Sequence, residues 1–138
     1  MLKNKILLFV AFSLVGLFLY SNDNDTRRGP ILSFDNDRYE LGRIHIDSMP
    51  EGNLFKLEIP FTNTGDEPIV ITNIRACCGT RVNDYPREPV IVGEEGIIEV
   101  QFRLAPRVQR VNRTVTVDYN SLQRTSVVQR ISGEVYEN

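Results

Sequence analysis

The sequence has few of the residues on which most enzymes depend. It contains a single histidine, His45, in 138 residues. The H-E-x-x-H motif of zinc hydrolases and the G-x-S-x-G motif of serine hydrolases are both absent. No glycine-rich loop follows a predicted strand and opens a helix, so the sequence lacks a phosphate cradle for nucleotides. We therefore predict no catalytic, cofactor-binding or metal-binding residues, and a protein that is not an enzyme.

Paired carboxylates do occur, but in positions that do not favour acid–base catalysis. Asp35 with Asp37, and Glu94 with Glu95, lie in predicted turns between strands. General acid–base catalysis requires a carboxyl group held at a reacting atom, whereas turn carboxylates are ordinarily solvated. We interpret both pairs as surface charges, and no small-molecule substrate is evident.

Positive charge is also scarce. The formal net charge is -2, and without Lys3 and Lys5 the chain keeps 14 basic residues against 18 acidic ones. Nucleic-acid binding needs a dense positive face. The composition therefore excludes nucleic acid as a predicted partner.

Only one long hydrophobic run is present, and it lies at the N-terminus. Residues 6–20 (ILLFVAFSLVGLFLY) carry no charge and follow Lys3 and Lys5, the pattern of an export signal. A helix of this length spans about 22 Å, less than the roughly 30 Å hydrocarbon core of a membrane. The length favours a cleaved signal peptide, but no A-x-A site follows, so a retained membrane anchor stays open. We predict a signal peptide or anchor helix over residues 1–20, a polar linker over 21–30, and a periplasmic or exported domain of the cell envelope.

The remainder, residues 31–138, shows strand patterns and no helix signal. In residues 53–63 (NLFKLEIPFTN), apolar side chains alternate with polar ones, as in a half-buried strand. Pro60 cannot donate a hydrogen bond, so this position is expected at a sheet edge or a bulge. Asn63-Thr64-Gly65-Asp66 predicts a turn with Gly65 at positive φ. Further alternation occurs over residues 31–34, 39–46, 69–74, 98–104, 115–119 and 127–135.

About seven short strands separated by regular turns predict an all-β fold. The spacing is typical of a single antiparallel immunoglobulin-like β-sandwich. A small barrel gives a similar pattern and is the alternative.

Several segments resemble a bacterial immunoglobulin-like family of unknown function, numbered fifteen-seventy-three and related in fold to major-sperm-protein and Hydin-type domains. The resemblance runs from about residue 30 to residue 136. Residues 61–71 (FTNTGDEPIVI) resemble the family's segment "f.f.NtGd.pl.I", and residues 39–44 (YELGRI) resemble its "fG.i" step. Residues 89–96 resemble its "pi.PGe.g" turn, and residues 133–135 its closing "i.G.v". The resemblance implies an immunoglobulin-like fold and a location outside the cytoplasm, but it implies no reaction.

The two cysteines, Cys77 and Cys78, are adjacent, and they are the only candidate reactive residues in the sequence. The family's central loop usually reads Ser-Cys-Gly-Cys-Thr, and here Thr80 stands in place of the second cysteine. Neighbouring Cα atoms are about 3.8 Å apart, below the usual ~4.4 to 6.8 Å of disulfides. If the strand continued, the two side chains would also start on opposite faces. We expect one buried and one partly exposed thiol, with Cys78 the better candidate for the buried one.

These observations give two hypotheses of different classes. The first is a non-enzymatic interaction module of the cell envelope, which presents loops or an edge strand to another envelope protein. The second is an envelope thiol protein, redox or copper-handling, in which Cys77 and Cys78 are the candidate reactive thiols. The membrane is a further partner through residues 6–20 if that segment is not cleaved.

Overall fold

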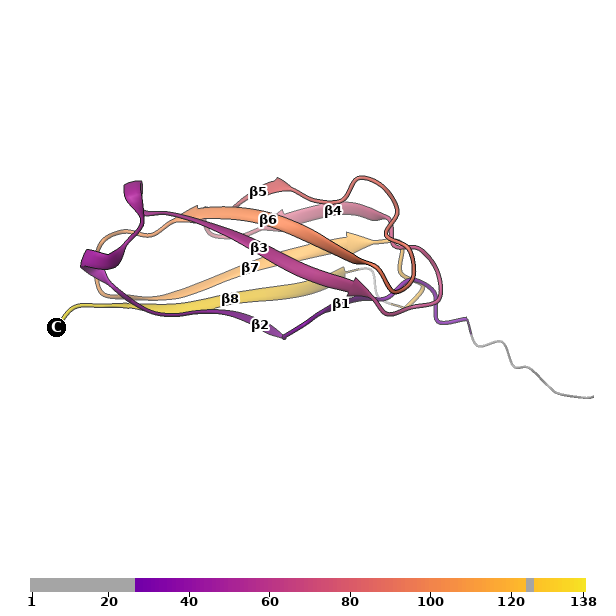
Figure 1. Cartoon of the computed structure of the whole chain (residues 1–138), viewed down its shortest axis with the longest axis horizontal. Helices are drawn as coiled ribbons and strands as arrows, with labels where there is room; N and C mark the ends of the chain where they lie inside the picture. Colours follow the sequence, from indigo (N-terminus) through magenta and orange to yellow (C-terminus); the bar gives the residue numbers. More distant parts are fainter. Residues whose placement is uncertain (1–26, 124–125) are drawn as a thin grey trace, which may run out of the picture.

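The computed structural model describes residues 27–123 and 126–138 (Figure 1). The predicted signal or anchor helix, and most of the predicted linker, lie outside these residues. Within them, no helix is long and apolar enough to cross a membrane.

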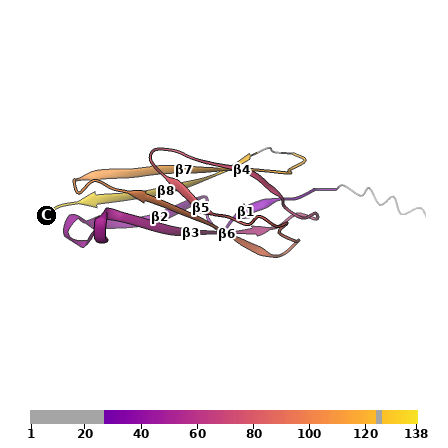
Figure 2. The same ribbon diagram turned by 90° about the horizontal axis from the view of Figure 1, so that it is seen from above.

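The described chain is a β-sandwich of two four-stranded sheets, which confirms the predicted all-β fold. The first sheet has the order β1-β3-β6-β5 and the second the order β2-β8-β7-β4. Seen from above, β3 and β6 lie in one layer and β4 and β7 in the other (Figure 2). Two short 3-10 helices, η1 (Ile46–Ser48) and η2 (Glu51–Asn53), connect β2 to β3. The strands are β1 (Leu32–Phe34), β2 (Arg38–His45), β3 (Leu54–Asn63), β4 (Ile71–Ala76), β5 (Arg81–Asp84), β6 (Glu95–Arg103), β7 (Gln109–Tyr119) and β8 (Ser126–Tyr136).

Two details of the predicted architecture need correction. The sequence indicated about seven strands and no strand between residues 74 and 98, whereas β5 forms in that interval. This strand has four residues, of which only Val82 is partly buried, so it is too short to show alternation. The sandwich is also not purely antiparallel, because β2 pairs with β8 in parallel.

The parallel pair results from a crossover near the start of the domain. The chain leaves the first sheet after β1, bends over residues 35–37, and joins the edge of the second sheet as β2. The register of β2 against β8 shifts between Glu40 and Arg43, next to Gly42 with a φ of 75°. A parallel pair needs a connection that does not simply reverse the chain, and here almost the whole domain separates the two strands.

The core lies between the two sheets and follows the predicted alternation. Phe61, Ile98, Val100, Val115, Val117 and Ile131 are fully buried, while Phe102 is 2% exposed. Phe55, Leu57 and Ile71 are partly buried and pack against this core. Inward side chains from both sheets therefore form one continuous hydrophobic layer.

The segment after β3 ties the start of the described chain to the sandwich. The backbone N–H groups of Thr64 and Asp66 donate to the carbonyl oxygens of Ile31 and Gly29, at 2.9 and 3.0 Å. The backbone N–H of Arg28 donates to the Asp66 carboxylate at 2.9 Å. This hydrogen bond is the main cause that lowers the pKa of Asp66 below its ordinary value of 3.8.

Gly65 occupies the middle of this segment for a reason other than the predicted one. The chain does bend over residues 65–67, but Gly65 is not among the residues with positive φ. Instead, a Cβ atom on Gly65 would collide with the Gly29 carbonyl oxygen and lie 2.6 Å from the Ile31 nitrogen. These are backbone atoms, so they cannot rotate away.

We expect Gly65→Ala to lower the free energy of unfolding by about 1 to 3 kcal/mol, because the methyl group overpacks the backbone contact. Thr64→Ala is the neighbouring control; the exposed Thr64 hydroxyl forms a hydrogen bond with the Ser33 hydroxyl at 2.7 Å, and its loss should cost less than about 1 kcal/mol. Urea denaturation of both variants measures the difference. Equal and small losses would contradict the close backbone approach.

Candidate functional site

A cavity of about 620 Å³ opens where the chain crosses from β1 to β2. The crossover residues 35–37 form one wall, and β3 contributes Ile59 and Pro60 from the first sheet. Gln129 of β8 contributes from the second sheet, so the cavity reaches between the two layers. The remaining lining residues are Phe34, Arg38, Tyr39 and Glu40.

The β3 edge beside this cavity is unpaired over part of its length. Thr64 donates to Ile31 on the β1 side, whereas Asn63 donates to Glu94 on the β6 side. Backbone groups alternate in direction along a strand, so the even-numbered residues of β3 face β1. The β1 register ends with Phe34 opposite Phe61.

Residues 54–60 of β3 therefore extend beyond the end of β1. Among the described residues, no strand accepts from or donates to the outward backbone groups of Lys56 and Glu58. Pro60, whose nitrogen carries no hydrogen, also faces this side and thus lies at a sheet edge, as predicted. The result is a short open edge that runs away from the cavity.

The chemistry of the cavity is mixed. Asp35, Asp37 and Glu40 supply three carboxylates against the single guanidinium of Arg38, which lies 3.9 Å from Glu40. Gln129 is only 3% exposed, and its Oε1 atom has no hydrogen-bond partner among the described residues. The cavity therefore combines an acidic rim with a buried hydrogen-bond acceptor.

The sequence pattern does carry a signal for Gln129. Val127, Ile131 and Val135 share one face of the alternating segment 127–135, and position 129 belongs to the same face. A polar residue at an inward position of a strand is unusual, because burial of an unpaired amide is costly. Such a residue indicates a cavity or a polar partner.

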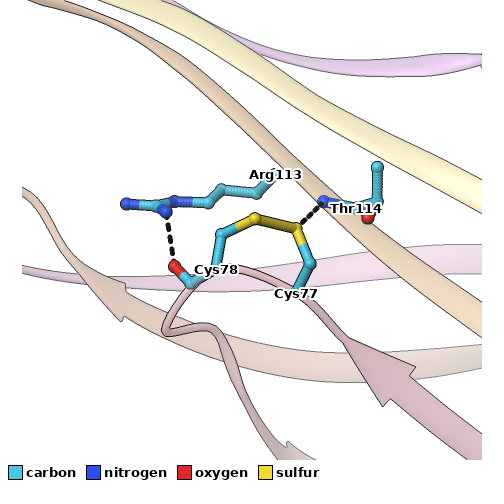
Figure 3. The surroundings of a disulfide bond; sticks show 4 residues. All are labelled: Cys77, Cys78, Arg113 and Thr114. Carbon is cyan, nitrogen blue, oxygen red and sulfur yellow. Dashed lines mark hydrogen bonds between the residues drawn. A yellow bond between two sulfur atoms is a disulfide. The ribbon is translucent and has the colours of Figure 1, made fainter.

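The other predicted site residues, Cys77 and Cys78, form a disulfide with each other (Figure 3). The expectation of two free thiols is therefore wrong, and so is the assignment of Cys78 as the buried one. Cys78 is exposed and Cys77 is partly buried. The strand β4 ends at Ala76, and Cys78 then adopts a left-handed φ of 64°. Strand alternation no longer applies after Ala76, so the two side chains can meet.

The disulfide lies against β7. The Thr114 N–H points at the Cys77 sulfur, with 3.4 Å between nitrogen and sulfur, and the Cys77 N–H donates to the Thr114 carbonyl oxygen at 3.0 Å. The Arg113 guanidinium donates to the Cys78 carbonyl oxygen (Figure 3). Arg113 Nε and Thr80 Oγ1 are buried and have no hydrogen-bond partner within the described part of the chain. Thr80, at the place of the family's second cysteine, thus belongs to the same loop.

The remaining candidates do not assemble into a site. His45 packs edge-on against Tyr136 with 5.1 Å between ring centroids, and its Nδ1 accepts from the Asp47 N–H at 3.2 Å. Within residues 27–123 and 126–138, no three His, Cys, Asp or Glu side chains are grouped in a way that could hold a metal ion. Glu94 and Glu95 are exposed beside Gly93, at the start of β6.

Two sheets with these strand orders define an immunoglobulin-like β-sandwich, in which the parallel strand β2 forms one edge of the second sheet. Within that class, the chain belongs to the family described as "Protein of unknown function (DUF1573)", whose model matches residues 32–135. The resemblance seen in the sequence is thereby confirmed. No curated protein matches the chain.

Solved structures share the fold at low sequence identity. A protein of unknown function from Porphyromonas gingivalis W83 is 11% identical, with a TM-score of 0.60, over 78% of this chain and 48% of that one. The secreted serine protease VesC from Vibrio cholerae is 13% identical, with a TM-score of 0.58, over 80% of this chain and 24% of that one. The VesB protease of the same organism is 12% identical, with a TM-score of 0.51, over 76% of this chain and 31% of that one. This chain thus spans less than half of each of these structures, and the likeness concerns the fold alone.

Proposed function

We propose that this protein is a non-enzymatic interaction module of the cell envelope that binds an extended segment of another envelope protein along the open edge of β3. The observation that carries this function is the outer edge of β3 over residues 54–60, which pairs with no strand of the described chain and lies beside a cavity of about 620 Å³. An edge strand with free N–H and C=O groups is a template for strand addition. Main-chain hydrogen bonds then supply affinity, and pockets for alternate side chains supply specificity.

The cavity determines which side chains of an added strand fit this protein. A strand that continues the line of β1 along β3 directs every second side chain between the sheets. Opposite Ile59 such a side chain enters the cavity, where the Gln129 Oε1 atom receives no hydrogen bond from any described residue. The three carboxylates of the rim favour a basic residue nearby. We infer a partner segment with one inward side chain that carries an N–H donor, flanked by lysine or arginine.

The edge also carries features that limit unspecific pairing. Lys56 and Glu58 are exposed and charged, and Pro60 removes one donor from the edge. Charged residues and prolines are the usual means by which natural sheets prevent unwanted aggregation. Binding therefore requires a segment that fits the cavity as well as the backbone.

The N-terminal sequence supports an envelope location. Lys3 and Lys5 followed by 15 uncharged residues are typical of a segment that directs a chain into or across the cytoplasmic membrane. Protease added to spheroplasts should then digest the domain, and protection equal to that of a cytosolic protein would contradict this location.

A proline substitution tests the edge directly. We expect short peptides selected from a random display library against the full chain to bind Glu58→Pro at least about tenfold more weakly, equal to ~1.4 kcal/mol. Proline removes the N–H that faces the open edge and leaves the β6 side intact, since odd-numbered residues pair there. Fluorescence anisotropy with the purified chain in detergent measures the affinities.

Glu58→Ala is the matched control, because it removes the same carboxylate but keeps the backbone N–H. It should bind the selected peptides within about threefold of the original chain. Hydrogen exchange provides a second readout: the amides of Lys56 and Glu58 should exchange fast in the free chain and slowly with peptide bound. Peptides that bind Glu58→Pro as tightly as Glu58→Ala would exclude strand addition at β3.

A further inference from the structure

We propose that the Cys77–Cys78 disulfide is a thiol–disulfide exchange site that accepts two electrons from a dithiol. This site lies away from the β3 edge, and neither depends on the other. The disulfide is in the loop between β4 and β5, which form one pair of outer strands, whereas the cavity adjoins β1 and β2, the opposite pair.

A purely structural role does not account for this disulfide. A disulfide stabilises a fold mainly because it shortens the loop that the unfolded chain must close, and the gain grows with loop length. The sequence separation of Cys77 and Cys78 is 1, so their bond closes no chain segment. The bond restrains the local backbone only, including the left-handed φ of 64° at Cys78.

The two sulfur atoms are in different surroundings. Cys78 is an exposed residue, whereas Cys77 is partly buried against β7, and on this ground we assign the Cys78 sulfur as the one open to an attacking thiolate. Exchange requires access to one sulfur and a good leaving group at the other. This difference selects Cys78 as the sulfur that is attacked and Cys77 as the thiolate that leaves.

The surroundings of Cys77 suit a departing thiolate. The Thr114 N–H already points at its sulfur, with 3.4 Å between nitrogen and sulfur. The Arg113 side chain lies alongside the disulfide, with its guanidinium on the Cys78 side (Figure 3), and it forms no ion pair with any carboxylate of the described chain. Its Nε, and the Oγ1 of Thr80 in the same loop, are buried and have no hydrogen-bond partner among the described residues. Positive charge and hydrogen-bond donors both stabilise a thiolate.

The exchange balances in two steps. A thiolate of the dithiol attacks Cys78 Sγ, a new sulfur–sulfur bond forms, and the bond between Cys77 and Cys78 breaks with its electron pair on Cys77. The second thiolate of the same dithiol then attacks the dithiol sulfur that is bonded to Cys78. The dithiol closes its own disulfide, and Cys78 leaves as a thiolate. The dithiol is oxidised to its disulfide, and the protein gains two electrons and two protons as Cys77 and Cys78 become thiols.

The test uses dithiothreitol as the dithiol and the full chain in detergent. Free thiols are alkylated at intervals and counted by mass spectrometry. We expect none before reduction, two after it under native conditions, and none again once dithiothreitol is removed and oxidised glutathione, a stronger oxidant, is added. A chain with two alkylatable thiols that oxidised glutathione does not remove would overturn the proposal. So would a disulfide that dithiothreitol reduces only after urea has unfolded the chain.

Substitution of Arg113 tests how the site works. Arg113→Gln should slow the second-order reduction by dithiothreitol about tenfold, and Arg113→Lys, which keeps the charge, should restore most of the rate. Arg110→Gln removes the same charge from the same strand and should leave the rate unchanged. Circular dichroism confirms that each variant is folded. Equal reduction rates for Arg113→Gln and Arg110→Gln would exclude the assigned role of Arg113.

Discussion

Replacement of Phe61 with alanine is expected to lower the free energy of unfolding by about 3 to 5 kcal/mol, because it removes a fully buried ring from the centre of the core. Phe61 is 0% exposed and lies opposite Gly96 in the β3–β6 register. A Cβ atom on Gly96 would collide with the Phe61 ring, so the ring covers the glycine. Since small domains are stable by only ~5 to 15 kcal/mol, the variant should lose much of its resistance to urea.

The pairing of Phe61 with Gly96 provides a sharper test than the single variant. Gly96→Ala alone should be destabilising, because its methyl group meets the ring. In the Phe61→Ala background the same change should cost less, since the ring is gone, although Pro86 remains 3.0 Å from the added Cβ. The neighbouring Ile97→Ala is the control; Ile97 is 46% exposed and its loss should cost less than about 0.5 kcal/mol. Additive effects of the two core changes would contradict the contact.

Asn63→Asp is expected to destabilise the fold by about 2 to 4 kcal/mol at neutral pH, although the side chain keeps its size. Asn63 is 1% exposed. Its Nδ2 donates to the carbonyl oxygens of Glu67 and Val90 at 2.8 and 2.9 Å, and its Oδ1 accepts from the Gly65 N–H at 3.0 Å. A carboxylate in this place would turn a negative oxygen toward two carbonyl oxygens.

The loss in Asn63→Asp should depend on pH in a defined direction. Burial and the two carbonyl groups favour the protonated acid, so the pKa of the new carboxyl group is raised in the folded state. The folded chain then binds a proton more tightly than the unfolded chain, whose carboxyl pKa is about 3.9. Stability relative to the original chain should therefore be highest below that pKa and fall as pH rises through the folded value.

Urea denaturation at several pH values measures this dependence. The exposed Asn73→Asp serves as the control, and its small effect should stay within about 0.5 kcal/mol. A pH-independent deficit for Asn63→Asp would show that the side chain is not held between the two carbonyl groups.

The fold could be predicted from the sequence because most of its information lies in local alternation. Phe61, Ile98 and Val117 occur at inward positions of clearly amphipathic strands. Burial of the apolar face of such a strand stabilises the folded state whichever strand it pairs with. The crossover from β1 to β2 was not predictable in this way. Side-chain alternation describes the two faces of a strand but does not state which sheet the strand joins or in which direction its neighbour runs.

The candidate sites were less predictable because each depends on backbone geometry. For Cys77 and Cys78, the face assignment assumed a continuing strand, and one left-handed residue changed it. For Gly65, the turn was recognised but its cause was a close approach by residues 29–31, far away in the sequence. The edge of β3 was indicated only by Pro60, because the length of β1 determines how much of the edge stays open.

The parallel pairing of β2 with β8 also determines how the domain carries mechanical load. The described chain enters at one end of the long axis and its C-terminus lies at the other (Figure 1). Tension between these ends pulls β2 and β8 in opposite directions along their shared axis, because the two strands run parallel. Their hydrogen bonds are then loaded in shear and must break together, whereas a hairpin pulled open at its free ends loses its bonds one after another. A domain proposed to stand on an N-terminal tether thus has its load-bearing strands in the geometry that resists extension.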